Sequence, residues 1–353
     1  MLDMSFELPT FEQKKSLHSL LLTMEQEVEA RKGDADEWGE SRPYFERKFQ
    51  QGDRNIRLLG TKHSPNLIDI EKDVAVYRET DPEILLHEGN DIRVVFQNVF
   101  PGMTEDEIRE LDPVVIAKNQ EQIFLAWQAW KDGKTVQSWD IPFSEQVKMV
   151  AHRHTPEAIA GFVVSIALSK LYQDNIQPSQ ESMEDLLPRV LSQKDRDDLA
   201  SAGIDLSFAS LERAAQKYLK TSFTSLAERF SDEKLRKEDN GFFHRYFDPA
   251  YPGETNAVLK DMNVIRDQHA IDVMEEAKSK YKNVLAVAGG SHVRTWGPAV
   301  AELYKDQDRQ MSEGSGAVFE ALEDNPKKIA ERENRHEKDQ VSAQEIADRL
   351  KTS

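Results

Sequence analysis

The sequence predicts an α/β fold, with a central mixed sheet flanked by helices and interrupted by a long helical insertion. Two observations predict it. Short apolar segments that end at glycine or at polar turn residues occur on both sides of a long middle section, as buried strands do. The middle section, at about 104–240, follows the helical period, and capping residues mark its helix starts. We therefore expect one α/β domain interrupted in sequence rather than two domains in tandem.

Residues 1–50 are expected to form a helical preface. Leucine, methionine and valine recur at helical spacing over 11–31, and the segment 38–49 is rich in aromatic residues. The preface is predicted to pack against the domain that follows.

Three short apolar segments come next and are predicted to be strands, at 56–59, 84–87 and 92–99. They open a catalytic-type α/β domain that we expect to span 51–304.

Capping patterns place the helices of the insertion. Thr104 with Glu107 is a capping box, Ser144 begins another helix, and Thr155 precedes a proline at a first helical position. The sheet resumes at 284–288, and a helix follows it. The composition then shifts, so that 305–353 is expected to be a charged tail, partly helical or disordered.

Composition and charge narrow the functional classes. The chain has 353 residues, a mean hydropathy of −0.65 and no apolar stretch near the roughly 18 to 20 residues that a bilayer requires. Its N-terminus lacks a secretory signal pattern, so we expect a cytoplasmic protein without a membrane partner. The net charge of −18 repels phosphates, so we expect no nucleic-acid partner. The absence of cysteine excludes disulfides, thiolate metal sites and cysteine nucleophiles.

Two histidines share a setting that indicates a site. His63 follows Gly60 by three residues, His292 follows Gly289 by three, and each motif comes directly after a predicted strand. The glycine lets the chain turn out of the sheet, and the histidine is then expected in the crevice at the strand ends, where open α/β sheets bind ligands. A third Gly-x-x-His, ending at His244, follows charged and amide residues and is interpreted as coincidence.

Glu88 ends another predicted strand and completes a candidate metal site. His63, Glu88 and His292 are a sufficient protein set for a divalent metal that keeps one position open for water. The alternative is that all three are ordinary polar residues at strand ends.

A predicted helix at 262–274 carries Arg266 and Asp267. A guanidinium near a metal can bind a substrate carboxylate or stabilise an oxyanion. The alternative is that Arg266 is a solvent-facing helix charge.

These motifs, in this order, resemble the superfamily of Tiki/TraB, erythromycin-esterase-like and ChaN proteins. The resemblance rests on Gly60 to His63, on Glu88, on Arg266 with Asp267, and on Gly289 to His292. It covers essentially 56–91 and 262–304. It implies an α/β fold with a cleft at the strand ends, and metal-dependent hydrolysis in the Tiki-like branch. Erythromycin-esterase relatives use a histidine base on a lactone, and ChaN-like relatives bind haem.

Two other groups of residues are candidates for a metal or ligand site. His152 and His154 form a His-x-His pair just before a helix cap, where a helix-terminus role is favoured over a metal role. The aromatic residues of 242–251 can line a substrate or haem pocket, with His244 or Tyr246 as axial ligand, or else belong to the core.

The leading hypothesis is a soluble, metalloprotease-like or esterase-like hydrolase that cleaves a peptide or ester bond of a peptide or small-molecule substrate. The metal ligands would be His63, Glu88 and His292, binding Mn, Co or Zn. Glu88, Arg266 and His292 would be catalytic, and Arg266, Asp267 and Lys62 would bind substrate. One alternative is a protein that binds haem or another planar ligand in the same cleft. Another is an inactive scaffold that docks a protein partner through its acidic C-terminal tail and helical insertion.

Overall fold

The computed structural model describes residues 16–34, 45–61, 67–89, 91–117, 121–173, 184, 187, 191, 193–222, 225 and 252–305. The chain divides into two compact units. Unit 1 comprises 1–140 and 267–353, and unit 2 comprises 141–266. Unit 2 is therefore inserted into the sequence of unit 1, and it begins later than the predicted start of the insertion near residue 104.

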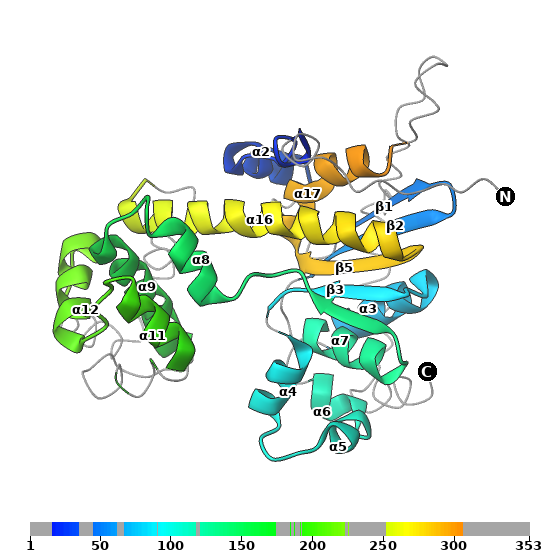
Figure 1. The fold of residues 1–353 in the computed structure, drawn as a ribbon, viewed down its shortest axis with the longest axis horizontal. Helices are drawn as coiled ribbons and strands as arrows, with labels where there is room; N and C mark the ends of the chain where they lie inside the picture. The colour runs from blue at the N-terminus through cyan, green and yellow to red at the C-terminus, as the bar shows by residue number, and fades with distance from the viewer. Residues whose placement is uncertain are drawn as a thin grey trace, which may run out of the picture. The chain divides into compact units, whose positions relative to one another are not determined.

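Unit 1 contains a five-stranded mixed sheet, which confirms the predicted fold class (Figure 1). The strand order is β1-β2-β5-β3-β4, with all neighbours parallel except the β1–β2 hairpin. The strands are β1 Phe45–Gln51, β2 Arg54–Thr61, β3 Ile84–His87, β4 Thr135–Ser138 and β5 Asn283–Gly289. The predicted strands at 56–59, 84–87 and 284–288 are confirmed as parts of β2, β3 and β5.

Helices cover both faces of this sheet, which is why its central strands are continuous apolar runs. Leu59, Leu85 and Val287 lie in one core with the first group of helices, and Leu58, Leu86 and Ala286 lie in the other core with the second group. The first group is α3 Leu67–Thr80, α4 Ile92–Val99, α5 Glu105–Arg109, α6 Pro113–Ala117 and α7 Glu121–Lys131 (Figure 1). The second is α17 Gly290–Leu303 and the C-terminal part of α16 Glu254–Lys280, with α2 Met24–Asp34 against α17.

Unit 2 is helical and has a core of its own. It contains α8 Phe143–Val150, α9 Pro156–Gln173, α11 Gln193–Ser201, α12 Phe208–Ala214, the π-helical turn η1 Ala215–Leu219 and the N-terminal part of α16. A Cβ on Gly161 of α9 would lie 2.9 Å from the side chains of Tyr218 and Thr255, so this glycine permits a close helix contact. The predicted cap of α9 is confirmed, because Thr155 Oγ1 accepts a hydrogen bond of 3.2 Å from the backbone N–H of Ala158.

The predicted strand at 92–99 is wrong, because this segment is helix α4. Asp91 starts the helix by accepting a 2.9 Å hydrogen bond from the N–H of Arg93. Ile92 and Phe96, four residues apart, are both buried on one face. The short run of apolar and β-branched residues is compatible with a strand or with a helix. The cap at Asp91 and the buried face favour the helix.

Three other local predictions also need correction. The helical preface ends in strand β1, whose predominantly polar sequence gives no clear strand pattern and which is fixed by pairing with β2. The helix predicted over 11–31 is interrupted at 19–23, where the backbone is not helical. The predicted helical block contains β4, which pairs with β3.

The capping box at Thr104 and Glu107 is confirmed.

Several predictions fall outside the described residues. These are the aromatic cluster and Gly-x-x-His at 241–251, and all but the first residue of the charged tail at 305–353.

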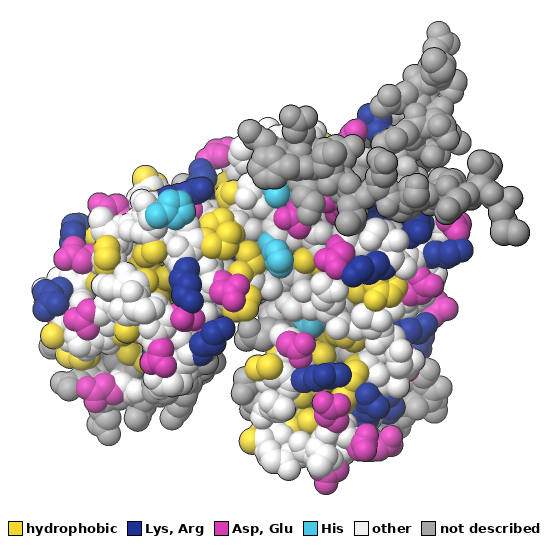
Figure 2. Space-filling view, viewed as in Figure 1, with side chains coloured by type: hydrophobic (Ala, Val, Ile, Leu, Met, Phe, Trp, Pro, Cys, Tyr) yellow, Lys and Arg dark blue, Asp and Glu magenta, His cyan; other side chains and the backbone are white. Residues whose placement is uncertain are grey.

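No helix within the described ranges is long and apolar enough to cross a membrane. Acidic and basic side chains are interspersed over the face shown in Figure 2.

Candidate functional site

The carboxyl ends of β2, β5 and β3 meet at one edge of the sheet of unit 1. These strands are parallel neighbours, so their last residues, Thr61, Gly289 and His87, lie at one edge. The strands that precede the predicted motifs therefore end at one sheet edge, as predicted. Lys62 and His63 lie outside the described residues, and their roles stay predictions.

Glu88 is tied to the start of helix α17. Its Oε2 accepts a 3.2 Å hydrogen bond from the backbone N–H of Gly289, the N-cap residue of α17. A carboxylate at this position is favoured by the positive end of the helix dipole. The contact holds the Glu88 side chain at the end of β5. His292 lies in the first turn of α17, which follows this end of the strand.

Gln122 joins the ends of β2 and β3 and was missed by the sequence analysis. This buried side chain of α7 donates from Nε2 to Thr61 Oγ1 at 3.1 Å and to Glu88 Oε2 at 3.5 Å. In sequence it is one glutamine in a helical pattern, and only the tertiary structure brings it to the strand ends.

His292 is bonded to Asp267 of α16. The distance from His292 Nδ1 to Asp267 Oδ1 is 2.7 Å, and Trp296 Nε1 donates to the same oxygen at 2.6 Å. The side chains of His292 and Asp267 are only 12% and 9% exposed. Asp267, predicted to bind substrate, is thus engaged in orienting His292.

Two buried tryptophans enclose this pair. The ring centroids of Trp139 and Trp296 are 4.8 Å apart in an edge-on arrangement, and Trp139 lies 5.5 Å from the ring of His292. Trp139 is held in turn by a 2.9 Å hydrogen bond from its Nε1 to the carbonyl oxygen of Val287. Fixed aromatic neighbours restrict the imidazole to one orientation.

The Asp267 contact defines what His292 can do. A neutral imidazole that donates from Nδ1 carries its lone pair on Nε2, so Nε2 is the atom that accepts a proton or binds a metal. The carboxylate also stabilises the imidazolium that forms when Nε2 takes a proton. The same carboxylate–histidine arrangement orients metal-binding histidines.

A further histidine, His87, ends β3 at the same sheet edge and was also missed. It is almost completely buried, its Nδ1 donates to the carbonyl oxygen of Glu88 at 2.9 Å, and its Nε2 has no hydrogen-bond partner in the described part of the chain. Burial lowers the pKa of His87, against the smaller opposing effects of the Glu88 carbonyl and of Asp91, Asp140 and the Glu88 carboxylate.

Arg266 immediately precedes Asp267 on α16, but it belongs to unit 2. Its predicted binding of substrate or of an oxyanion stays a prediction.

The metal site predicted at His63, Glu88 and His292 stays a prediction. In it, Glu88 and His292 would supply an oxygen and a nitrogen ligand, and Asp267, which is bonded to His292, would orient that histidine. Within the described residues, no group of three or more His, Asp or Glu side chains is placed to hold a metal ion. A three-ligand site therefore depends on His63.

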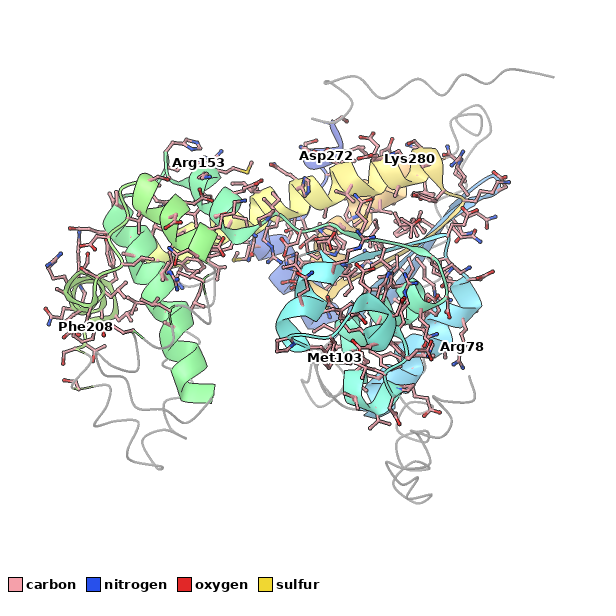
Figure 3. The ribbon with its side chains drawn as sticks, turned by 60° about the horizontal axis from the view of Figure 1, so that its bottom comes forward. Arg78, Met103, Arg153, Phe208, Asp272 and Lys280 are labelled. Carbon is pink, nitrogen blue, oxygen red and sulfur yellow. The ribbon has the colours of Figure 1, made fainter. Side chains whose placement is uncertain are left out.

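The His-x-His pair lies in the turn between α8 and α9, at a helix end as predicted. His154 Nε2 lies 3.0 Å from Asp261 Oδ2, and Arg153 Nη1 lies 3.7 Å from the same oxygen. Figure 3 labels Arg153 in this turn.

Comparison of the chain with protein-family models, with curated proteins and with solved structures finds no match.

Proposed function

We propose that this protein is a hydrolase that cleaves an ester or peptide bond at the carboxyl-terminal edge of the unit 1 sheet, with His292 as its general base. The observation that carries the proposal is the 2.7 Å contact between His292 Nδ1 and the buried carboxylate of Asp267. This pairing fixes the tautomer and the orientation that a histidine base needs.

In the proposed reaction, His292 Nε2 takes a proton from water while the water oxygen attacks the substrate carbonyl. Asp267 stabilises the resulting imidazolium, and the Trp296 N–H keeps the carboxylate oxygen in place. Imidazolium then gives the proton to the leaving oxygen or nitrogen. Glu88, held at the same edge, is the second acid–base group.

The proposal includes membership of the superfamily of Tiki/TraB, erythromycin-esterase-like and ChaN proteins, which the paired Gly-x-x-His motifs support. If a divalent metal takes part, His63, Glu88 and His292 would hold it, and it would supply a bound water of lowered pKa. The cytoplasmic location remains a prediction from the sequence.

A matched pair of variants tests the proposal. We expect His292→Gln to lower kcat by about 10²- to 10⁴-fold, as loss of a general base does, and His154→Gln to leave kcat unchanged. The assay uses a p-nitrophenyl ester, a simple lactone and a fluorogenic peptide, with circular dichroism of each variant to show that it is folded. Full activity of folded His292→Gln on a substrate that the protein cleaves would reject the proposal.

Chelation separates the two branches of the mechanism. A histidine base acting alone predicts activity that survives exhaustive treatment with a chelator but is lost in His292→Gln. Loss of activity on chelation and its return with Mn²⁺, Co²⁺ or Zn²⁺ would assign the metal-dependent branch instead.

A further inference from the structure

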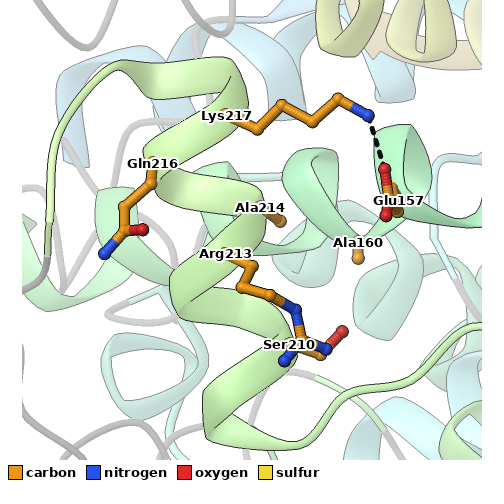
Figure 4. Close-up of a pocket in the computed structure, with 7 residues that line it drawn as sticks. All are labelled: Glu157, Ala160, Ser210, Arg213, Ala214, Gln216 and Lys217. Atoms are coloured by element: carbon orange, nitrogen blue, oxygen red, sulfur yellow. Dashed lines mark hydrogen bonds and ion pairs between the residues drawn. The ribbon is translucent and has the colours of Figure 1, made fainter.

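Unit 2 contains a pocket that lies entirely among its own helices. It has a volume of about 450 Å³ and lies between the first turns of α9 and the α12–η1 segment (Figure 4). Ala160 of α9 and Ala214 of α12 line it with methyl groups. Small side chains facing each other keep the space open, and a volume of this size holds a small organic molecule.

Two cations four residues apart line this pocket. Lys217 Nζ lies 2.5 Å from Glu157 Oε2, the pairing drawn in Figure 4. Arg213 lines the same pocket but has no ion pair or hydrogen bond from its guanidinium within the described residues. Lys217 lowers the pKa of Glu157, and Arg213 adds a smaller effect in the same direction, so both cations act on this carboxylate.

The helix that carries these cations is irregular at the pocket. The segment Ala215–Leu219 is a π-helical turn, and it ends at Lys220, which has a φ of +55°. Isolated π-turns are unfavourable relative to regular α-helix and are often found at functional sites. Lys217 lies within this turn and Arg213 lies just before it, so the irregular backbone coincides with the pocket and supplies a second reason to regard it as a binding site.

We propose that this pocket binds a small organic anion, with a carboxylate or phosphate group and a short aliphatic body. The planar guanidinium of Arg213 would donate two parallel hydrogen bonds to the anionic group. The aliphatic body would lie against Ala160 and Ala214, and Glu157 would compete with the ligand for Lys217. The site is separate from the proposed hydrolase residues, so each proposal can fail without the other.

Titration of the full chain with butyrate and with inorganic phosphate, followed by the NMR signal of the Arg213 Nε–H group, tests the site. We expect saturable binding that weakens with added salt. Butyrate binding tighter than phosphate binding assigns the carboxylate with its aliphatic body, and the reverse order assigns the phosphate group. Arg213→Met should weaken binding of the preferred probe by about tenfold or more, measured by calorimetry.

A second variant, for which we expect tighter rather than weaker binding, makes the test specific. Glu157→Gln removes the competing carboxylate and should tighten binding, whereas Glu145→Gln, which changes the net charge equally from an exposed position on α8, should not. Lys194→Met on α11 controls for loss of a surface cation elsewhere in unit 2. Absence of saturable binding of both probes, or equal affinity of Arg213→Met and the unmodified chain, would overturn the proposal.

Discussion

Helix α16 carries three aspartates that each bind a histidine from another segment: Asp272 binds His18, Asp267 binds His292 and Asp261 binds His154. The last two pairs, called the unit 1 pair and the unit 2 pair, differ in their surroundings. In unit 1, His292 Nδ1 lies 2.7 Å from Asp267, and in unit 2, His154 Nε2 lies 3.0 Å from Asp261. The histidines are equally buried, at 12% and 13% exposure, but Asp267 is 9% exposed and Asp261 is 30% exposed. Asp267 is therefore the less solvent-exposed of the two carboxylates.

The neighbours of the two carboxylates differ as well. Asp267 receives a second hydrogen bond from the buried Trp296, whereas Asp261 has the exposed Arg153 nearby. His292 of the unit 1 pair also lies on α17, which follows β5, at the edge where Glu88 follows β3. A His–Asp contact therefore indicates a site only when its surroundings fix it and place it beside other reactive groups.

The largest expected effect comes from removing the charge of the carboxylate in the unit 1 pair. Asp267→Asn should lower kcat by about 10²- to 10⁴-fold, because the imidazolium loses its stabilising partner and the tautomer of His292 is no longer fixed. The matched variant Asp261→Asn should leave kcat unchanged. Steady-state kinetics of both variants measure the contrast, and equal losses would show that the two pairs do not differ in function.

A smaller effect is expected from the tryptophan that holds this carboxylate. Trp296→Phe keeps an aromatic side chain, although a smaller one, but loses the N–H donor to Asp267, so unfolding free energy should fall by about 1.5–3 kcal/mol, as for a hydrogen bond to a charged group. We expect kcat to fall by about tenfold because Asp267 is less well oriented. The control is Trp127→Phe, which loses a bond of 2.9 Å to the carbonyl oxygen of Ile108 and should cost about 1 kcal/mol without changing kcat.

His87 provides a contrast in pH dependence, since burial lowers its pKa and its Nδ1 donates to a backbone carbonyl oxygen rather than to a carboxylate. Below its unfolded value of about 6.5, the unfolded chain takes up the proton first. Stability should therefore fall as pH decreases from about 6.5 to the lower folded pKa, by at most about 1.4 kcal/mol per pH unit. Chemical denaturation at several pH values should show this slope in the unmodified chain and in the exposed control His152→Gln, but not in His87→Gln.

The smallest effect concerns the turn that carries His154. Thr155→Ala removes the cap of α9 and should lower the stability of unit 2 by about 1 kcal/mol. Hydrolase activity should not change, because the lost hydrogen bond caps a helix of unit 2 and the proposed catalytic histidine lies in unit 1. Thermal unfolding with parallel activity measurements checks this, and a large loss of kcat would link the turn to the site.

Local patterns in the sequence were sufficient for the strands β2, β3 and β5 and for the helix caps at Thr104 and Thr155. Apolar runs bounded by turn residues, and hydroxyl residues before helices, act within a few residues of the chain and do not depend on distant partners. The topology that follows from parallel strands also brings Glu88 and the His292 motif to one sheet edge, as expected from the sequence.

Partners from distant segments were decided only by the tertiary structure. Strands β1 and β4 are set by pairing with β2 and β3, and the burial of Ile92 and Phe96 on one face favours helix for the segment 92–99. The bonds from His292 and Trp296 to Asp267 join residues 25 and 29 positions apart, and Gln122 reaches Thr61 across 61 positions. Nothing in the sequence near a buried polar group shows which distant atom will satisfy it, because that choice depends on how whole elements pack.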